Sequence, residues 1–324
     1  MALGKYDFGA EISSGFDSSL ICYLLKKNSL KSFNSYCEIA KAAIKDTQAD
    51  VVQEFAQKHS LEVKFIPYDH LFPFSTKDDL EWVKQGPSLI QKSQAYNFFL
   101  TIGKDGNLAR FTGDGGDEAY WSNDEVLSLK LKYPIQKHYF ESISLRKYGI
   151  DKILSEKGSK ALFDKERYKN KNTYPLFVSN SSATLLTSTF PLCWETKVWP
   201  ITPFMDTRLI QIARGIPSKG KEKSILKQEI WKGRDDIFTK RQFREKGGTE
   251  EHYQRFLKEK RKFVKSVLKN SLLGEKGWVK SSEILSDVSK GIIKPYIEGE
   301  KMSYLINLLE IEYFIQENNV RVSS

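Results

Sequence analysis

The sequence predicts an α/β fold with a parallel sheet, and three observations support this prediction. Short apolar runs alternate with helical patterns along the first 111 residues. The connections between them are short, which favours parallel strands joined by right-handed crossovers. Two of the apolar runs are followed at once by polar, glycine-containing turns. The carboxyl ends of parallel strands meet at one edge of a sheet, so these turns are expected to lie together there.

The elements of this fold follow from hydrophobic periodicity. Apolar runs predict strands at Tyr6–Ile12, Ser32–Cys37, Leu61–Ile66 and Leu108–Phe111. Apolar residues at helical spacing predict helices from about Ser18 and at Asp46–His59, Lys77–Val83 and Gln91–Ile102. Beyond about residue 120 helical patterns outweigh strands, with further helices expected at Leu127–Tyr133, Phe140–Leu154, Leu209–Arg214 and Leu305–Ile315. A sheet in the first half and a helix-rich C-terminal half are therefore expected.

Composition excludes several classes of protein. The chain has 324 residues, 40% of them hydrophobic, which is enough for one large core or two closely joined subdomains. It contains no apolar run of about eighteen residues and no opening signal-peptide pattern, so we expect a soluble, cytoplasmic protein without a membrane partner. Three cysteines without C-x-x-C spacing and four histidines without a ligand pattern argue against zinc. Cys22 lies on an apolar helix face and is expected to be a buried thiol.

The positive charge has two interpretations. A net charge of +10 and a pI of about 9.2 could attract ATP, an acidic substrate or RNA. The alternative is a set of solvated lysine-rich faces, and Lys258–Lys269 supports it, because its apolar residues follow a helical period and its lysines fill the other face. That helix lacks the interleaved aromatics of a single-strand nucleic-acid platform, so we expect no nucleic-acid partner.

The first polar turn, Ile12–Ser19, joins a strand to a helix N-terminus. Such a turn directs backbone N–H groups and the positive end of a helix dipole at one spot, which suits a phosphate. Ser13, Ser18 and Ser19 add hydroxyl groups, and Gly15 allows close approach. Asp17 would repel a phosphate unless a cation lay between them, so we interpret it as a Mg²⁺ ligand. The alternative is an ordinary capped helix.

The second polar turn, Thr112–Glu118, holds three glycines and three carboxylates within seven residues. A structural turn needs one or two of those glycines, and such a composition cannot form core. An acidic, glycine-rich loop beside a serine-rich loop with its own aspartate favours a site for a metal-bound nucleotide.

Five stretches resemble one protein family. The segment Ser13–Ser19 resembles the Ser-Gly-Gly-x-Asp-Ser-Ser loop of the ATP pyrophosphatases, with Ser14 in place of the first glycine. The Thr112–Glu118 segment resembles the second signature of one branch, the asparagine synthetase and β-lactam synthetase group. Pro203–Asp206 is similar to that branch's Pro-Phe-Leu-Asp, and Lys223–Lys227 to its Lys-x-x-Leu-Arg. The matches follow the family's order and span nearly the whole chain, and Leu305–Ile315 resembles its closing helix.

The resemblance implies a fold, cofactors and site residues. The fold would be a five-stranded, Rossmann-like sheet of the adenine-nucleotide α-hydrolase type, and the cofactors would be ATP and Mg²⁺. The residues expected to bind the nucleotide are Ile12, Ser13, Ser14, Gly15, Asp17, Ser18, Ser19, Thr112 and Gly113. Asp17 and Asp117 would hold the metal. Asp114 occupies the loop position where the asparagine branch has Glu and the β-lactam branch has Tyr.

Two lysines complete the expected catalytic set. Lys223 matches a family residue that contacts the leaving pyrophosphate. The family places a catalytic lysine about twenty residues further on, but direct counting reaches Phe243, which cannot serve. We favour Lys246, because the glycines beside it suit a mobile loop, and Lys240 remains the rival.

The implied reaction is amide-bond formation through adenylation of a carboxylate, with release of AMP and pyrophosphate. Glutamine-dependent members begin with an amidohydrolase domain whose nucleophile is a cysteine at position two, where this chain has Ala2. Ammonia or an amine is therefore expected to arrive free or from a separate glutaminase. Trp199–Thr202 stands where aspartate-binding members carry charge, which favours a less polar small-molecule or peptide carboxylate.

Several alternatives remain open. A tRNA-modifying ATP pyrophosphatase would share the first loop, and a stand-alone ammonia-dependent asparagine synthetase would share all the motifs. A descendant that only binds nucleotide is a third alternative. We expect residues 1–235 to form the synthetase core and 236–324 a helical extension that closes the same domain; a homodimer stays open.

Overall fold

The computed structural model describes two separate parts of the chain. The described residues are 7–29, 31–40, 48–74, 77–85, 92–116, 152–162, 189–215, 229, 247–292, 294–297 and 301–322. The first unit combines the described residues of 1–70, 95–133 and 175–246, and the second those of 71–94, 134–174 and 247–324. The expected boundary at residue 235 lies outside the described residues. Within the described part of the chain, no helix has both the length and the apolar character needed to cross a membrane.

The first unit is built on a five-stranded sheet in which every pair of neighbours is parallel. The strands are β1 (Phe8–Glu11), β2 (Asn34–Ile39), β3 (Glu62–Pro67), β4 (Ala109–Phe111) and β5 (Trp199–Ile201). Their order across the sheet is β3-β2-β1-β4-β5. This confirms the predicted Rossmann-like α/β fold with a five-stranded parallel sheet.

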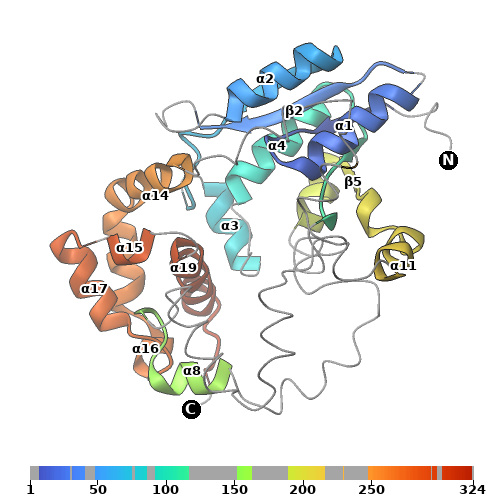
Figure 1. Ribbon diagram of the computed structural model, residues 1–324. Coiled ribbons are helices and arrows are strands. Elements are labelled where there is room, and N and C mark those ends of the chain that lie inside the picture. Colours follow the sequence, from blue (N-terminus) through green and yellow to red (C-terminus); the bar gives the residue numbers. More distant parts are fainter. Residues whose placement is uncertain are drawn as a thin grey trace. The chain divides into compact units, whose positions relative to one another are not determined.

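Helices cover both faces of this sheet. Along β1, Phe8, Ala10 and Ile12 enter a core shared with α1 (Phe16–Asn28) and α2 (Gln48–His59). The opposite face meets α4 (Lys92–Lys104), whose Phe98, Phe99 and Ile102 form a second core with Tyr36 and Cys193. Figure 1 shows α2 and α4 on opposite sides of β2. Alternation along the strands therefore sends one set of side chains to each layer.

The strand order reverses direction between β1 and β4. From β1 the chain builds outward through β2 to β3, and it then crosses to the other side of β1 to form β4. The register pairs Phe8 with Ala109 and Ala10 with Phe111, so both strands end at the same edge. In open α/β sheets, ligands bind outside the carboxyl ends of the strands at this kind of switch point.

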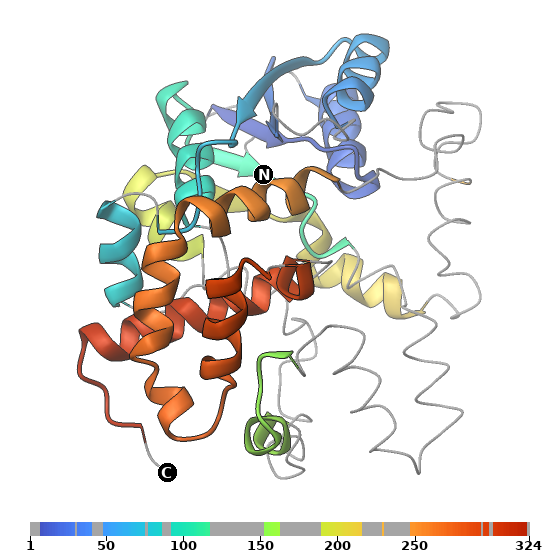
Figure 2. The same cartoon turned by 90° about the vertical axis from the view of Figure 1, so that its left-hand side faces the viewer.

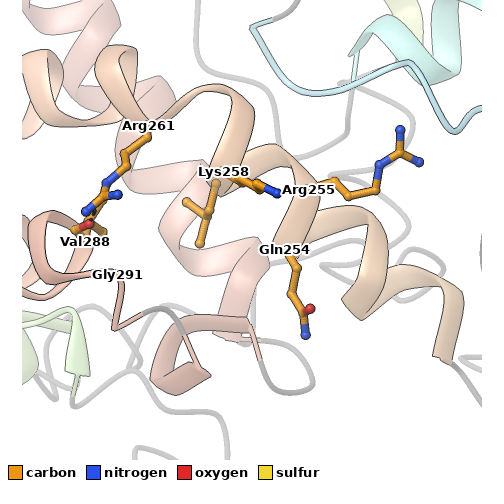
Figure 3. Close-up of a pocket in the computed structure, with 7 residues that line it drawn as sticks. Gln254, Arg255, Lys258, Arg261, Val288 and Gly291 are labelled. Carbon is orange, nitrogen blue, oxygen red and sulfur yellow. Dashed lines mark hydrogen bonds between the residues drawn. The ribbon is translucent and has the colours of Figure 1, made fainter.

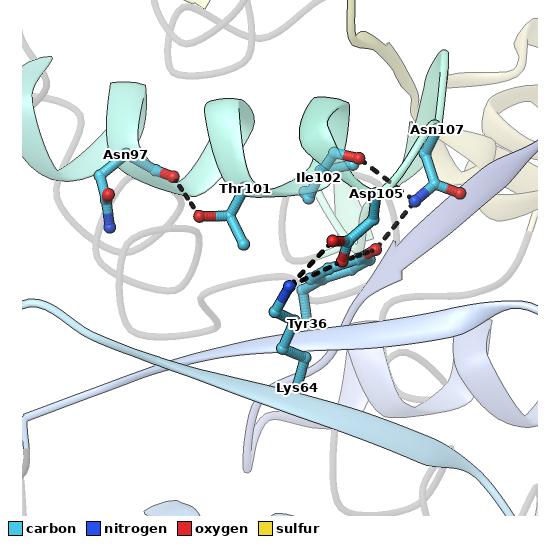
Figure 4. Close-up of polar contacts among 7 residues, drawn as sticks. All are labelled: Tyr36, Lys64, Asn97, Thr101, Ile102, Asp105 and Asn107. Carbon is cyan, nitrogen blue, oxygen red and sulfur yellow. Dashed lines mark hydrogen bonds and ion pairs between the residues drawn. The ribbon is translucent and has the colours of Figure 1, made fainter.

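A polar network fastens α4 to the sheet beneath it (Figure 4). The Tyr36 hydroxyl donates to Asp105 Oδ2 at 2.9 Å and accepts from Asn107 Nδ2 at 2.8 Å, and Lys64 Nζ lies 2.9 Å from Asp105 Oδ1. The ring of Tyr36 passes over Gly9, where an added Cβ would lie 2.5 Å from Tyr36 Cε2. Burial, together with Asp105, raises the pKa of Tyr36 to about 12, so its hydroxyl keeps its proton. This network lies beside the segment that enters β4, away from the edge where β4 ends.

The described elements of the second unit are helical. They are α3 (Lys77–Gln85), α8 (Glu156–Leu162), α14 (Gly247–Glu259), α15 (Arg261–Lys269), α16 (Leu272–Glu275), α17 (Ser281–Lys290), α18 (Lys294–Ile297) and α19 (Lys301–Glu317). Figure 2 shows α14 to α19 gathered in the orange-to-red part of the ribbon. Their apolar faces share one core, which includes Phe256, Val264, Ile284 and Leu309. The helix-rich C-terminal half is thereby confirmed.

A buried carboxylate organises one end of this second core. Glu312 on α19 is fully buried, and it accepts hydrogen bonds from the Ser271 hydroxyl and from the backbone N–H groups of Leu272 and Leu273, both at 3.0 Å. These N–H groups belong to the first turn of α16, which has no partners for them within the helix. Glu312 therefore joins α16 to α19.

The structure corrects some of the predicted elements. The β5 strand was not expected, and the helix expected over Lys258–Lys269 is interrupted at Lys260, where α14 gives way to α15. Leu154, the expected end of a helix, instead forms an antiparallel bridge with Val279. Most of that helix and all of Leu127–Tyr133 lie outside the described residues. The other strand and helix predictions in the described part agree to within about two residues at most ends.

Candidate active site

The two polar turns lie at the switch point of the first unit. The first turn leaves β1 at Ile12 and enters α1 at Phe16, and the second follows β4 from Thr112. The Thr112 N–H donates to Ile201 O of β5 at 3.0 Å, which continues the sheet pairing up to the base of the acidic loop. The site is therefore built on the ends of three neighbouring strands.

Serine hydroxyls hold the first turn in shape. Ser13 Oγ and Ser18 Oγ are 2.8 Å apart, and the Ser13 N–H donates to Ser18 Oγ at 3.1 Å. Gly15 N–H donates to Ser13 Oγ at 3.1 Å, and Ser19 Oγ donates to Ser13 O at 2.8 Å. Ser18 and Ser19 are buried, as is Ile12, whose side chain lies in the core. These three buried residues therefore support the turn on its core side.

The outer residues of this turn remain accessible. Ser13, Ser14, Gly15 and Asp17 are half-buried, and they surround the N-terminus of α1. Gly15 occupies the N-cap position in extended conformation and has no side chain with which to cap the helix. The first turn of a helix then favours an anion, through its N–H groups and its dipole. This geometry suits the phosphate-binding role predicted from the sequence.

The acidic loop touches the first turn so closely that glycine is required. An added Cβ at Gly113 would lie 2.5 Å from Ser18 N and 2.9 Å from the Asp17 carbonyl carbon. An added Cβ at Gly116 would lie 2.6 Å from Asp17 Cγ. The two sequence motifs, about one hundred positions apart, thus meet at Asp17. The loop closes on itself, because Asp114 N–H donates to Thr112 Oγ1 at 3.2 Å and Gly116 N–H to Gly113 O at 3.2 Å.

The third motif also joins this edge. Pro203–Met205 forms the 3-10 turn η3 directly after β5. Gly115 has a φ of +88°, a left-handed conformation that favours glycine, and an added Cβ there would lie 2.6 Å from Met205 Cγ. Of the five stretches that carry the resemblance, three therefore converge in the described residues.

Asp206 both caps a helix and forms an ion pair with Arg208. Asp206 Oδ1 accepts from Arg208 N–H at 2.9 Å, which caps α11 (Thr207–Gly215), and Arg208 Nη2 lies 2.8 Å from Asp206 Oδ2. The Arg208 guanidinium and backbone N–H lower the pKa of Asp206 to about 2. Asp206 therefore fixes the start of α11 beside the site.

One charged pair at this edge was not predicted from the sequence. Glu11, the last residue of β1, accepts a hydrogen bond from Arg110 Nη1 of β4 at 2.9 Å. Glu11 also neighbours Thr112, because the strand register pairs Ala10 with Phe111, and it lies within electrostatic range of Asp114. Burial raises the pKa of Glu11 above its ordinary value, although Arg110 and Thr112 act in the opposite direction. The sequence signal for this pair is Glu11 itself, a charged residue at the end of an otherwise apolar strand.

The residues present fit a magnesium-bound phosphate. Asp17 presents its carboxylate at the point where the missing Cβ of Gly116 leaves room, and Asp117 follows Gly116 directly in the chain. Carboxylate, hydroxyl and backbone oxygens are the ligands that Mg²⁺ prefers. Within the described part of the chain, no cluster of three or more His, Cys, Asp or Glu residues could hold a metal ion by itself. Asp17 and Asp117 offer oxygen donors of the kind that Mg²⁺ prefers.

Some predicted residues cannot be placed. Asp117, Lys223, Lys246 and its rival Lys240 lie outside the described residues. Cys22, Cys37 and Cys193 are buried thiols outside any disulfide, as expected for Cys22, whose burial raises its pKa to about 12.

The structure corrects the role expected of Trp199. Trp199 begins β5 opposite Ala109, at the end of the strand away from the acidic loop, and it makes edge contacts with Phe190 and Trp194. Only Ile201, opposite Phe111, and the following Thr202 reach the carboxyl edge. Trp199 therefore does not line this edge, and it gives no support to the expectation of a less polar substrate.

A pocket of about 550 Å³ in the second unit is a weaker candidate. It lies among α14, α15 and α17, and Arg255, Lys258 and Arg261 contribute its cationic side chains. Figure 3 shows Arg255 and Arg261 pointing away from each other. Arg261 Nε donates to Val288 O at 3.0 Å near the end of α17, and Arg255 lies over the Phe72 ring at 5.5 Å. Because these cations do not converge, the pocket does not form an anion site.

Comparison with known proteins adds no further assignment. A scan against protein-family models and a search of curated proteins each returned no match for this chain.

Proposed function

We propose that this protein is an ATP-dependent carbon–nitrogen ligase that adenylates a carboxylate and transfers the acyl group to ammonia or an amine. The observation that carries the proposal is the meeting of three motifs at one sheet edge. Gly113 and Gly116 touch the Asp17 turn, and Gly115 touches Met205. Chain segments so far apart in sequence would not need such close packing if each were an ordinary turn.

The reaction would proceed in two steps. An oxygen of the substrate carboxylate attacks the α-phosphorus of ATP, the bond to the bridging oxygen breaks, and pyrophosphate leaves. The amine nitrogen then attacks the acyl carbon, loses a proton, and AMP leaves with the electrons of the acyl–oxygen bond. The first step gathers negative charge on phosphate oxygens, and the second needs a proton acceptor.

Residues of the first turn would bind and orient the triphosphate. The N-terminus of α1, which has no side-chain cap, and the helix dipole suit the phosphate charge. Asp17 and Asp117 would hold Mg²⁺. When bound, the ion would supply positive charge to the phosphate oxygens. Lys223 would contact pyrophosphate, and Lys246, or its rival Lys240, would stabilise the oxyanion of the second step.

Asp114 is the candidate proton acceptor. It lies on the acidic loop three residues after Phe111, and its backbone is held by Thr112. A carboxylate at this position can accept the proton that the attacking amine loses. The substrate carboxylate is a small molecule or part of a peptide. Three thiols that form no disulfide, and the use of ATP, are compatible with a reducing cytoplasmic setting.

Nucleotide products test the proposal. Purified protein with Mg²⁺-ATP, a panel of carboxylates and ammonia or an amine should release AMP and pyrophosphate in a carboxylate-dependent manner. Release that requires added RNA would favour the tRNA-modifying alternative. Asparagine formation from aspartate and ammonia would identify a stand-alone asparagine synthetase. Nucleotide binding without turnover under any of these conditions would indicate a binding protein.

A further inference from the structure

The Glu11–Arg110 pair spans the two strands between which the sheet order reverses. Arg110 Nη1 lies 2.9 Å from Glu11 Oε2, and the side chains are 8% and 31% exposed, respectively. Arg110 also packs over the Phe99 ring at 4.3 Å. The Arg110 side chain is thus buried between the sheet and α4. The more exposed Glu11 side chain lies at the edge of the sheet that carries the acidic loop.

A continuous set of contacts leads from this pair to Asp114. Arg110 donates to Glu11, Thr112 lies opposite Glu11 in the register that pairs Ala10 with Phe111, and the Asp114 N–H donates to Thr112 Oγ1. Thr112 is only 1% exposed, so it is enclosed beside Glu11. Glu11 therefore neighbours the residue that holds the backbone of Asp114.

Stability alone does not account for this arrangement. Replacing a buried ion pair with apolar residues of similar volume is often neutral or stabilising, because the free energy of desolvating two charges can equal or exceed their electrostatic attraction. Here the pair also leaves Arg110 Nε buried without a hydrogen-bond partner in the described part of the chain. A pair retained for stability would not need to contact the acidic loop, and this one contacts it through Thr112.

We propose that Glu11 is a positioning residue for Asp114 in the amide-forming step. This inference rests on the proposed function. Glu11 anchors the acidic loop through Thr112, so that the Asp114 carboxylate is held where the attacking amine loses its proton. The adenylation step depends mainly on the first turn and is affected less.

Four variants separate positioning from structural support: Glu11→Gln, Glu11→Leu, Arg110→Met and the double variant Glu11→Leu/Arg110→Met. Gln retains a polar side chain beside Thr112, whereas Leu removes it. The double variant removes both buried charges at similar volume, so its fold should recover. Glu62→Gln, on the exposed start of β3, is the matched control.

The variants should affect the two half-reactions differently. In Glu11→Leu and in the double variant, kcat for amide formation should fall about 100-fold, as expected for a catalytic group displaced by about 1 Å. ATP–pyrophosphate exchange and KM for ATP should stay within about 3-fold of wild type, and Glu11→Gln should lose less than Glu11→Leu. Recovery of both melting temperature and amide formation in the double variant would show a purely structural pair and overturn the proposal.

A second measurement needs no turnover. Hydrogen exchange of the amides in residues 112–116, measured by mass spectrometry on the full chain, should be faster in Glu11→Leu and in the double variant than in wild type and Glu62→Gln. Unchanged exchange would overturn the anchoring role. If wild-type protein fails to turn over any carboxylate, the proposed function fails, while the exchange measurement still decides whether Glu11 positions the loop.

Discussion

Gly113→Ala tests how closely the two loops of the candidate site meet. The added Cβ would lie 2.5 Å from Ser18 N, and ordinary contact begins at 3.4 Å, so the loops would separate by about 0.9 Å (3.4 minus 2.5). The atoms it meets belong to the backbone at the start of α1, so no side-chain rotation relieves the overlap. Overpacking of this kind costs about 1–3 kcal/mol.

The functional effect should exceed the effect on folding. A displacement of about 1 Å in a reacting site can lower the rate about 100-fold. We therefore expect Gly113→Ala to lower the melting temperature by about 2–4 °C per kcal/mol lost, and to reduce ATP–pyrophosphate exchange about 100-fold. Calorimetric titration with Mg²⁺-ATP should show weakened binding at a temperature where the variant remains folded.

Gly106→Ala is the matched control. Gly106 has a φ of +85° and no atom within 4 Å of an added Cβ, so alanine strains the backbone without a steric clash. That strain costs on the order of 1 kcal/mol. Gly106 precedes β4, whereas the candidate site follows β4. Gly106→Ala should be destabilised but bind Mg²⁺-ATP normally. Wild-type binding and exchange in Gly113→Ala would refute the close contact between the loops.

Three further predictions concern other residues. Asp17→Asn and Asp117→Asn should each abolish turnover and weaken Mg²⁺-ATP binding by titration calorimetry; near-normal activity in either would exclude a shared metal. Glu312→Gln should destabilise the second unit by about 1.5–3 kcal/mol in urea unfolding, because a buried carboxylate holds the start of α16; an unchanged midpoint would contradict that role. Burial raises the pKa of Glu11, so Glu11 binds its proton more tightly in the folded protein than in the unfolded protein. The stability that this proton binding contributes is lost as pH rises through the pKa of the folded protein. The melting temperature of Glu11→Gln relative to wild type should therefore rise between pH 4 and pH 7, and a constant difference would contradict the shift.

Local patterns predicted much of the fold because they act over short distances. Apolar runs and helical periods located four of the five strands, and they located α1 to α4, α11, α15 and α19 to within a few residues. The described helices α8, α14, α16, α17 and α18 were not predicted. The fifth strand was missed because it has only three residues and contains Pro200. Proline is tolerated in β5 because this strand lies at the edge of the sheet, but its residues alone give no strand signal.

In the candidate site, too, local features were predicted from the sequence and long-range contacts were not. Its loops were predicted because serines, glycines and carboxylates cluster locally within each turn. The contact of Gly113 with Ser18, and the pairing of Glu11 with Arg110, join residues about one hundred positions apart. No local pattern encodes such pairs, since they follow from the strand order. The burial of Ser18 and Ser19 beneath the turn likewise depends on packing that the sequence does not display.

The products of ATP turnover test the central claim most directly. Wild-type protein should be incubated with Mg²⁺, ATP labelled in the α-phosphate, ammonia or an amine, and a panel of carboxylates, and the nucleotides then separated. The proposed ligase chemistry predicts labelled AMP and an equal amount of pyrophosphate, both dependent on one of the carboxylates. Labelled ADP as the main product would contradict it, because attack would then fall on the γ-phosphorus rather than the α-phosphorus.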